Sequence, residues 1–534
     1  MKLKGVVIIW AFVLVSCINQ HEPVTGITLE KSTLTLTMFA SEQLDFIIQP
    51  PDATNRNVTW TSSAPEVVYV TQDGIVTALN FTSDGNIKFN TGEGTSIAPV
   101  YEPAAGSAII TVTTADGGYQ ASITIYTTMA GTVDILDLPP IKDQFAGFFM
   151  MGNILRNPGT AAQWPNIVEV TGIGTNARII NQGLVRHFNA ITAENHMKPS
   201  FTITGRDFAT GDFIWNIANR SNLDNFLYAA EYHGMEVIGH TLLWHSQNAA
   251  WMWRDIATQD GTAIATREEA LEIMEAYITE KVGHFTGRIH TWDVLNEIFP
   301  NNAPSGADWR YSMRSNLGHG AANPWFAAIG YDFVYYGFLF ARRADPNAIL
   351  YYNDYNTDMP NRARLIRDMV QYVNDRYLAN EGSGSGRLLI EGIGMQEHHN
   401  LGITPESIQE AINLFRTLNI AGRNPIRLSV SELDILAYQN WSAFQGNGVG
   451  QASNSNHLST VTNDALAAQA RRFYEFFLVY LRNADIIERV SFWGINDNTS
   501  WRSSGLPLIF DHLGRAKPAY FRIIEALEYF KQTN

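Results

Sequence analysis

The chain has 534 residues, of which 45% are apolar, so it can bury a large core and is longer than one ordinary domain. Its formal net charge of −15 excludes nucleic acid as the main partner, because phosphate binding needs a basic surface. A single cysteine excludes an intramolecular disulfide framework. We therefore expect two or three domains that are stabilised by packing alone.

Residues 1–17 have the pattern of an export signal. Lys2 and Lys4 precede an apolar run, Val6 to Val15, that is too short to cross a bilayer as a helix. The run ends in Leu14-Val15-Ser16-Cys17, which resembles a bacterial lipobox, whose cysteine is lipidated. The alternative is an ordinary signal peptide with a chance cysteine. We expect an exported protein that a lipid at Cys17 anchors to the bacterial cell envelope or cell surface without spanning the membrane.

Residues 26–128 predict an all-β immunoglobulin-like sandwich. Two Asp-Gly pairs, Asp73-Gly74 and Asp116-Gly117, lie between apolar segments and indicate hairpins. The string Val58-Thr59-Trp60-Thr61-Ser62-Ser63 and the later Asp73-Gly74-Ile75-Val76-Thr77-Ala78 resemble a bacterial immunoglobulin-like domain of group 2. Such sandwiches serve unrelated functions. The domain could bind glycans or cell surfaces, but we favour a spacer that lifts the rest of the chain off the membrane.

A linker is expected over residues 129–142, and an α/β domain over residues 143–534. In this domain short apolar runs alternate with helical segments, such as the one that Thr266 and Glu269 begin with a capping-box pattern. The runs begin near Phe148, His187, Glu236, Ile289, Ile349, Leu389, Ile426 and Val490. Eight such units indicate a (β/α)₈ TIM barrel or a doubly wound sheet, and their spacing leaves both open.

Polar and aromatic residues follow seven of these runs. They are Glu194, Asn195 and Lys198 after the second; His240, Trp244, His245 and Gln247 after the third; Asn296 and Glu297 after the fourth; Asn353, Asp354, Tyr355 and Asn356 after the fifth; Gln396, His398 and His399 after the sixth; Glu432 and Asp434 after the seventh; and Trp493, Asp497 and Trp501 after the eighth. One such residue alone would be a cap or a buried hydrogen-bonding group. Together they predict one cleft at the carboxyl end of a barrel.

Two glutamates in this set, Glu297 and Glu432, suit glycoside cleavage. One carboxyl group protonates the leaving oxygen while the other attacks or stabilises the anomeric carbon. Glu297 follows the neutral Asn296, whereas a pair with His398 would keep Glu432 ionised and oriented. We therefore interpret Glu297 as the acid/base and Glu432 as the nucleophile.

The α/β region resembles glycoside hydrolase family 10, the endo-β-1,4-xylanases. The resemblance lies in the blocks Phe188–Lys198, Gly239–Gln247, Trp292–Glu297, Tyr352–Asn356, Gly394–His398, Ser431–Asp434 and Phe492–Asp497. It implies a TIM barrel, retaining double displacement by Glu297 and Glu432, and xylan and xylo-oligosaccharides as substrates. It also implies support by Asn296, His398 and Asp434, and sugar contacts from Glu194, Asn195, Lys198, His240, Trp244, Gln247, Tyr355, Gln396, Trp493 and Trp501. No cofactor or metal is expected.

Three alternatives stay open at this point. A cellulase of the same barrel type would often carry Asn-Glu-Pro, whereas this chain has Asn296-Glu297-Ile298. A catalytically dead glycan-binding lipoprotein would be expected to lack one of the two glutamates, and both are present. The third alternative is an adhesin that acts through its β-sandwich.

Overall fold

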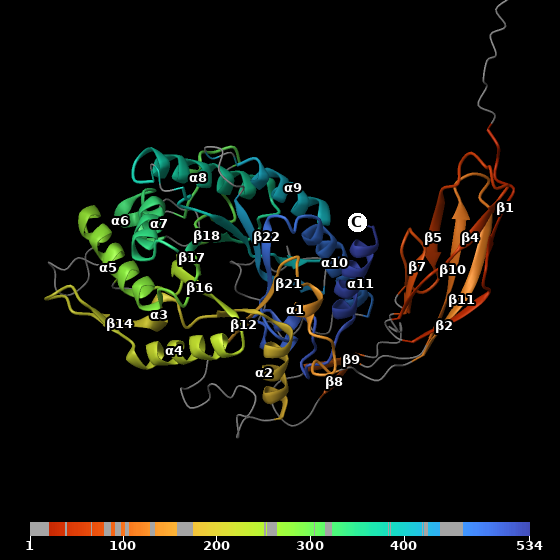
Figure 1. Cartoon of the computed structure of the whole chain (residues 1–534), viewed down its shortest axis with the longest axis horizontal. Helices are drawn as coiled ribbons and strands as arrows, with labels where there is room; N and C mark the ends of the chain where they lie inside the picture. The colour runs from red at the N-terminus through yellow and green to blue at the C-terminus, as the bar shows by residue number, and fades with distance from the viewer. Residues whose placement is uncertain are drawn as a thin grey trace, which may run out of the picture. The chain divides into compact units, whose positions relative to one another are not determined.

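The computed structural model describes residues 21–534, apart from 38–39, 66, 79–86, 91–97, 102–105, 129–133, 157–174, 250–251, 254–263, 304, 315–322, 383, 385, 419, 421–425, 438–462 and 534. The chain divides into two compact units (Figure 1). One consists of Met1–Thr82 and Pro103–Ala130, and the other of Ser83–Glu102 and Gly131–Asn534. Cys17 lies outside the described residues. Among those described, no helix has both the length and the apolar character needed to cross a membrane.

The first unit is all-β, as the sequence predicts. Its strands are β1 (Gly26–Leu29), β2 (Thr33–Thr37), β3 (Ser41–Gln43), β4 (Phe46–Gln49), β5 (Val58–Ser62), β6 (Val68–Val70), β7 (Ile75–Ala78), β10 (Ser107–Thr114) and β11 (Gln120–Thr128). They form the sheets β1-β4, β2-β11-β10-β5 and β3-β7-β6 around one core that includes Trp60 and Ile110. Both Asp-Gly hairpins are confirmed, because Gly74 and Gly117 have φ of 86° and 78° in turns between antiparallel strands.

The second unit contains a closed parallel barrel of eight strands. They are β12 (Met150–Leu155), β13 (Ala190–Ala193), β16 (Glu236–Leu243), β17 (Thr291–Asn296), β18 (Ile349–Asp354), β19 (Gly392–Met395), β21 (Arg427–Leu436) and β22 (Ile487–Phe492). In chain order the sheet runs β12-β13-β16-β17-β18-β19-β21-β22, and pairing of β22 with β12 closes it. The TIM barrel is therefore confirmed and the doubly wound sheet excluded. The predicted strand start at His187 was early, because α2 ends there.

Helices cover the barrel between successive strands (Figure 1). They are α1 (Ile141–Gln144), α2 (Thr175–His187), α3 (Pro199–Thr202), α4 (Ile217–Tyr232), α5 (Arg267–Phe285), α6 (Pro324–Ile329), α7 (Phe333–Ala344), α8 (Pro360–Ala379), α9 (Pro405–Arg416), α10 (Asn463–Arg482) and α11 (Pro518–Thr533). The capping residue of α5 is Thr266, whose side chain accepts from the Glu269 amide at 3.3 Å. This confirms where the sequence places the start of that helix.

Shorter elements complete the second unit. They are the hairpins β8–β9 (Ile87–Asn90, Ala98–Tyr101) and β14–β15 (Ile203–Arg206, Phe213–Trp215), strand β20 (His398–Asn400), and the 3₁₀ turns η2 (Trp309–Tyr311), η5 (Asp497–Thr499) and η6 (Ser503–Gly505). The β8–β9 hairpin groups with the barrel, although it falls within the range predicted for the sandwich.

Four consecutive barrel strands are followed by a residue in the left-handed backbone region. Gln247, Glu297, Asn356 and Glu397 have φ of 47°, 54°, 53° and 60°. They lie just beyond β16, β17, β18 and β19. For an L-residue this conformation costs about 1–2 kcal/mol, which the surrounding structure must offset. The carboxyl end of the barrel is therefore the strained end.

Candidate active site

Glu297 directly follows β17 and Glu432 lies in the second half of β21, and the two residues are only 8% and 5% exposed. Asn353 Nδ2 donates to Glu432 Oε1 at 2.7 Å and to Asn296 Oδ1 at 3.0 Å. Gln396 Nε2 donates to the same Asn296 oxygen at 3.1 Å and to Glu297 Oε1 at 2.9 Å. Each amide nitrogen thus uses both of its protons, and four hydrogen bonds in series join the two carboxylates.

Glu432 is held by a histidine that a second carboxylate orients. His398 Nε2 lies 3.1 Å from Glu432 Oε2, and its Nδ1 lies 2.9 Å from Asp434 Oδ2. Burial opposes charge on this ring, but Asp434 and Glu432 outweigh it and raise the pKa of His398 to about 9. The ring is therefore an imidazolium at neutral pH and donates to both carboxylates. On its far side, Asp434 pairs with the buried Arg502.

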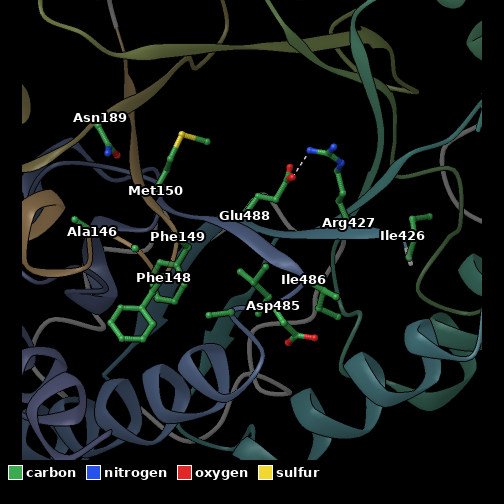
Figure 2. A pocket seen from close by; sticks show the side chains of 13 residues that line it. Ala146, Phe148, Phe149, Met150, Asn189, Ile426, Arg427, Asp485, Ile486 and Glu488 are labelled. Atoms are coloured by element: carbon green, nitrogen blue, oxygen red, sulfur yellow. Dashed lines mark hydrogen bonds and ion pairs between the residues drawn. The ribbon is translucent and has the colours of Figure 1, made fainter. Parts of the chain in front are cut away.

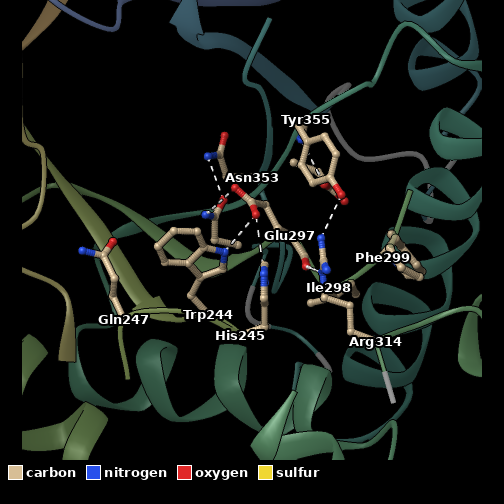
Figure 3. A network of polar contacts seen from close by, with 12 residues as sticks. Trp244, His245, Gln247, Glu297, Ile298, Phe299, Arg314, Asn353 and Tyr355 are labelled. Carbon is tan, nitrogen blue, oxygen red and sulfur yellow. Dashed lines mark hydrogen bonds and ion pairs between the residues drawn. The ribbon is translucent and has the colours of Figure 1, made fainter. Parts of the chain in front are cut away.

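Glu297 receives donors on both oxygens (Figure 3). Besides the bond from Gln396, Trp244 Nε1 donates to Oε2 at 3.0 Å, and Asn296 Nδ2 lies 3.3 Å from Oε1. Burial raises the pKa of Glu297, but His245, the Gln396 bond, Arg314 and the Trp244 bond outweigh it, and the net shift is downward. A general acid needs the opposite shift. These contacts therefore favour the ionised form of Glu297.

A buried arginine fixes the backbone around Glu297 (Figure 3). Arg314 Nε donates to the Glu297 carbonyl oxygen at 3.0 Å, and its Nη2 donates to the Tyr355 hydroxyl at 2.8 Å. His245 Nδ1 lies 4.0 Å from Glu297 Oε2. Burial and Arg314 lower the pKa of His245, whereas the charge of Glu297 opposes this shift.

On the other side of the cleft, a lysine joins three of the predicted sugar-binding residues. Lys198 Nζ donates to Asn195 Oδ1 and Gln247 Oε1, both at 2.9 Å, and lies 4.7 Å from the centre of the Trp244 ring. Glu194 is also buried, and Arg156 lies 3.8 Å from it. Ammonium, amide and carboxylate groups with an indole face form the kind of mixed surface that binds sugar hydroxyls and ring faces.

The remaining predicted residues line the same cleft. His240 Nδ1 lies 3.0 Å from Asp293 Oδ2, and its ring contacts Trp493 edge-on at 5.4 Å between centroids. Trp493 and Trp501 lie 6.4 Å and 5.1 Å from the His398 ring, also edge-on. Both tryptophans therefore border the histidine that holds Glu432.

Comparison with known proteins agrees with this geometry. Residues 159–526 match Glycosyl hydrolase family 10. The chain belongs to this family. Residues 23–100 match Bacterial Ig-like domain (group 2), which accords with the all-β first unit.

Three relatives illustrate the membership in family 10. Endo-1,4-beta-xylanase A of Thermotoga maritima is 32% identical over 391 residues, which cover 73% of this chain and 31% of the relative. The endo-1,4-beta-xylanase of Geobacillus stearothermophilus is 30% identical over 395 residues, covering 72% of this chain and 98% of the relative. The crystal structure of a bacterial Ig-like domain containing GH10 xylanase from termite gut has 39% identity and a TM-score of 0.67, covering 94% of this chain and 99% of that one.

A cavity of about 740 Å³ lies at the opposite end of the family 10 barrel (Figure 2). Its lining includes Phe148, Asn189, Ile426 and Ile486, each within two residues before a barrel strand. These are the amino ends of the strands, whereas catalytic groups in TIM barrels lie at the carboxyl ends. The cavity is therefore separate from the glutamates. No cluster of metal-binding side chains occurs in the described part of the chain.

The structure thus brings together the residues to which catalytic, supporting or sugar-binding roles were assigned, whereas Cys17 lies outside the described residues. Of the other residues predicted at strand ends, His245 and Asn353 also belong to this site, but His399 bonds to Glu397 and Asp497 pairs with Lys517. Two residues of the site were not predicted: Arg314 and Arg502. Arg314 and Arg502 come from loops, where no periodic pattern marks a residue as facing the cleft.

Proposed function

We propose that the protein is an endo-β-1,4-xylanase that hydrolyses internal bonds of xylan with retention of configuration. The observation that carries the proposal is the series of amide hydrogen bonds that joins Glu297 to Glu432. It holds two carboxyl groups in one buried cleft, as glycoside cleavage requires. The named activity of the relatives supports xylan as the substrate.

In the first step, Glu297 donates its proton to the glycosidic oxygen while Glu432 attacks the anomeric carbon. The bond to the leaving oxygen breaks, and a covalent glycosyl ester forms on Glu432. Glu297, now ionised, then removes a proton from water, whose oxygen displaces the ester. The lowered pKa of Glu297 suits this second role, because it favours the ionised form that accepts a proton. The proton for the first step requires that a bound sugar displaces donors such as Trp244 Nε1 from the carboxylate.

We propose the other roles from the resemblance to family 10. His398 and Asp434 orient the nucleophile, and Asn296 binds the hydroxyl next to the anomeric carbon. The glycone contacts come from Glu194, Asn195, Lys198, His240, Trp244 and Gln396, and Trp493 and Trp501 pack on sugar rings. Gln247 and Trp501 crowd the space that a hydroxymethyl group would need, which favours xylose over glucose. Tyr355 contributes to the aglycone side.

The first experiment measures reducing-sugar release from β-1,4-xylan, cellulose and mannan by the wild type and by Glu432→Ala. We expect release from xylan alone, and its loss in the variant. Azide then separates the two roles. With an activated aryl xylobioside, Glu432→Ala plus azide should give the α-azide by direct displacement, whereas Glu297→Ala plus azide should give the β-azide from the glycosyl ester. The reverse products would exchange the roles, and no release from any polysaccharide would reject the function.

We also propose that the protein is exported and anchored to the cell envelope by a lipid on Cys17. The support is the sequence Leu14-Val15-Ser16-Cys17 after an apolar run. Labelling of cells with a radioactive fatty acid should mark the full chain, and Cys17→Ser should remove both the label and the membrane association. A labelled Cys17→Ser variant would refute the anchor.

The immunoglobulin-like unit is proposed to act as a spacer. Removal of residues 26–82 and 103–128, which keeps the β8–β9 hairpin that groups with the barrel, should leave hydrolysis of soluble xylo-oligosaccharides unchanged, and also leave binding to insoluble xylan unchanged. If xylan binding disappears while the activity on oligosaccharides persists, the unit is a binding module.

A further inference from the structure

Directly behind the catalytic carboxylates lies a pair of charged residues that the proposed reaction does not use. Gln396 and His398 reach into the cleft, where they bond to Glu297 and Glu432. Their chain neighbours, Glu397 and His399, are only 1% and 3% exposed.

These two neighbours bond to each other inside the protein. Glu397 Oε2 lies 2.6 Å from His399 Nε2 and accepts from the Tyr480 hydroxyl, on α10, at 3.2 Å. Glu397 Oε1 accepts from Thr357 Oγ1 at 3.4 Å, and Phe476 packs edge-on against the His399 ring at 5.3 Å between centroids. The pair therefore connects the segment after β19 to α10 on one side and to the loop after β18 on the other.

A buried ion pair often contributes less to stability than apolar side chains that fill the same space. Removing two charges from water costs several kcal/mol per ion, and an apolar pair of similar volume is often as stable or more stable. Glu397 also has φ of 60°, where glycine would be free of strain. A carboxyl side chain that is buried, bonded to a buried histidine and strained at once points to a requirement of geometry beyond packing.

The backbone of this turn also holds the strand that carries the nucleophile. The Glu432 amide donates to the Gln396 carbonyl at 3.1 Å, and the Asp434 amide donates to the Glu397 carbonyl at 3.4 Å. Met395 pairs with Val430, but His398 pairs with Asp434, so β21 has one extra residue opposite the turn. Glu432 lies within this irregular stretch, where regular ladder pairing cannot fix its position.

We propose that Glu397 and His399 are positioning residues: their buried ion pair fixes the turn after β19 and so directs Gln396 toward Glu297 and His398 toward Glu432. This inference rests on the proposed function, because it concerns how the same two carboxylates are positioned. Neither residue touches the substrate, and both act through their neighbours.

The test compares Glu397→Gln with a matched control, Glu391→Gln. Glu391 directly precedes β19, at the opposite end of the strand, and its side chain is 15% exposed. It forms ion pairs with Arg342 at 2.6 Å and with Arg387 at 2.8 Å. Both substitutions replace a largely buried carboxyl group by an amide of the same size. A shift of about 1 Å in a catalytic group can cost about 100-fold in rate. We expect Glu397→Gln to lower kcat about 10- to 100-fold with KM unchanged, on xylo-oligosaccharides and on activated aryl xylobiosides alike, at a temperature where both variants are folded.

His399→Gln provides a second variant, because it keeps a donor toward Glu397 and stays informative if Glu397→Gln does not fold. The inference is overturned if kcat stays within threefold of the wild type in the folded variants, or if Glu391→Gln lowers kcat equally. Its failure is distinct from that of the proposed function, which would show as a wild type inactive on xylan or as reversed azide products.

Discussion

The hydrogen bond from Trp244 to Glu297 gives a prediction about pH. Trp244→Phe keeps an aromatic ring beside Lys198 but removes the Nε1–H that lies 3.0 Å from Glu297 Oε2. That donor favours the ionised carboxylate, so its loss raises the pKa of Glu297. Because the first step needs Glu297 protonated, activity should persist to higher pH in the variant.

The size of the shift follows from the bond. A hydrogen bond to a charged group contributes about 1.5–3 kcal/mol, and one pKa unit corresponds to about 1.4 kcal/mol. Water that enters the space left by the pyrrole ring recovers part of this energy. We therefore expect the high-pH limb of the profile to move upward by about 1 pH unit.

The assay is kcat/KM against pH with an unsubstituted xylo-oligosaccharide, since this parameter reports ionisation in the free enzyme. Trp493→Phe is the control, because this ring borders His240 and His398 rather than Glu297. A high-pH limb that stays in place in Trp244→Phe, or that moves equally in Trp493→Phe, would refute the reasoning. A change in KM alone, in either variant, would not test this reasoning.

Three further predictions follow. Glu297→Gln should abolish the high-pH limb and reduce hydrolysis of natural xylan by more than about 100-fold, yet leave fast formation of the glycosyl ester from aryl xylobiosides with good leaving groups, as burst kinetics would detect; equal loss on both substrates would contradict the acid role. Asn353→Leu removes the donor that bonds Glu432 and Asn296 together, so we expect kcat to fall at least about 10-fold with a melting temperature close to that of Asn353→Asp, measured by calorimetry beside steady-state kinetics. Lys281→Met should raise the melting temperature near pH 6 and much less near pH 10. Burial lowers the pKa of Lys281 to about 7, so the wild type gains stability as the pH rises from about 7 toward the ordinary lysine pKa of about 10.4. A difference in melting temperature between wild type and variant that does not depend on pH would exclude this account.

Much of the fold can be predicted from the sequence because its signals are local. The Asp-Gly turns and the Thr266 cap depend on neighbours within a few residues, and the structure has each where the pattern predicts it. Barrel closure is different, since it depends on the pairing of β12 with β22, whose residues are hundreds of positions apart. Strand spacing carries no information on that contact, so the spacing alone left an open sheet possible, and the barrel was expected only from the resemblance to family 10.

The site also has a part that the sequence predicts and a part that it does not. Glu297 and Glu432 follow apolar runs and can be identified as strand-end carboxylates from the sequence alone. The pKa of Glu297 cannot, because it depends on donors from two other strand ends and on Arg314 in a loop. Glu397 and His399 were also not predicted to act as a pair. Because side chains alternate along a strand, Glu397 and His399 are expected to point away from the side that Gln396 and His398 face. Alternation does not predict that Glu397 and His399 bond to each other.

The left-handed residues after β16 to β19 have a consequence for engineering. Glycine at any of these four positions would relieve about 1 kcal/mol of conformational cost, but at Gln247, Glu297 and Glu397 it would also delete a side chain that the cleft needs. At the carboxyl ends of these strands, a substitution that raises thermostability is therefore expected to lower kcat. At the amino ends, where Arg342 and Glu391 pair, the two properties are separable, and that end is where substitutions for thermostability belong.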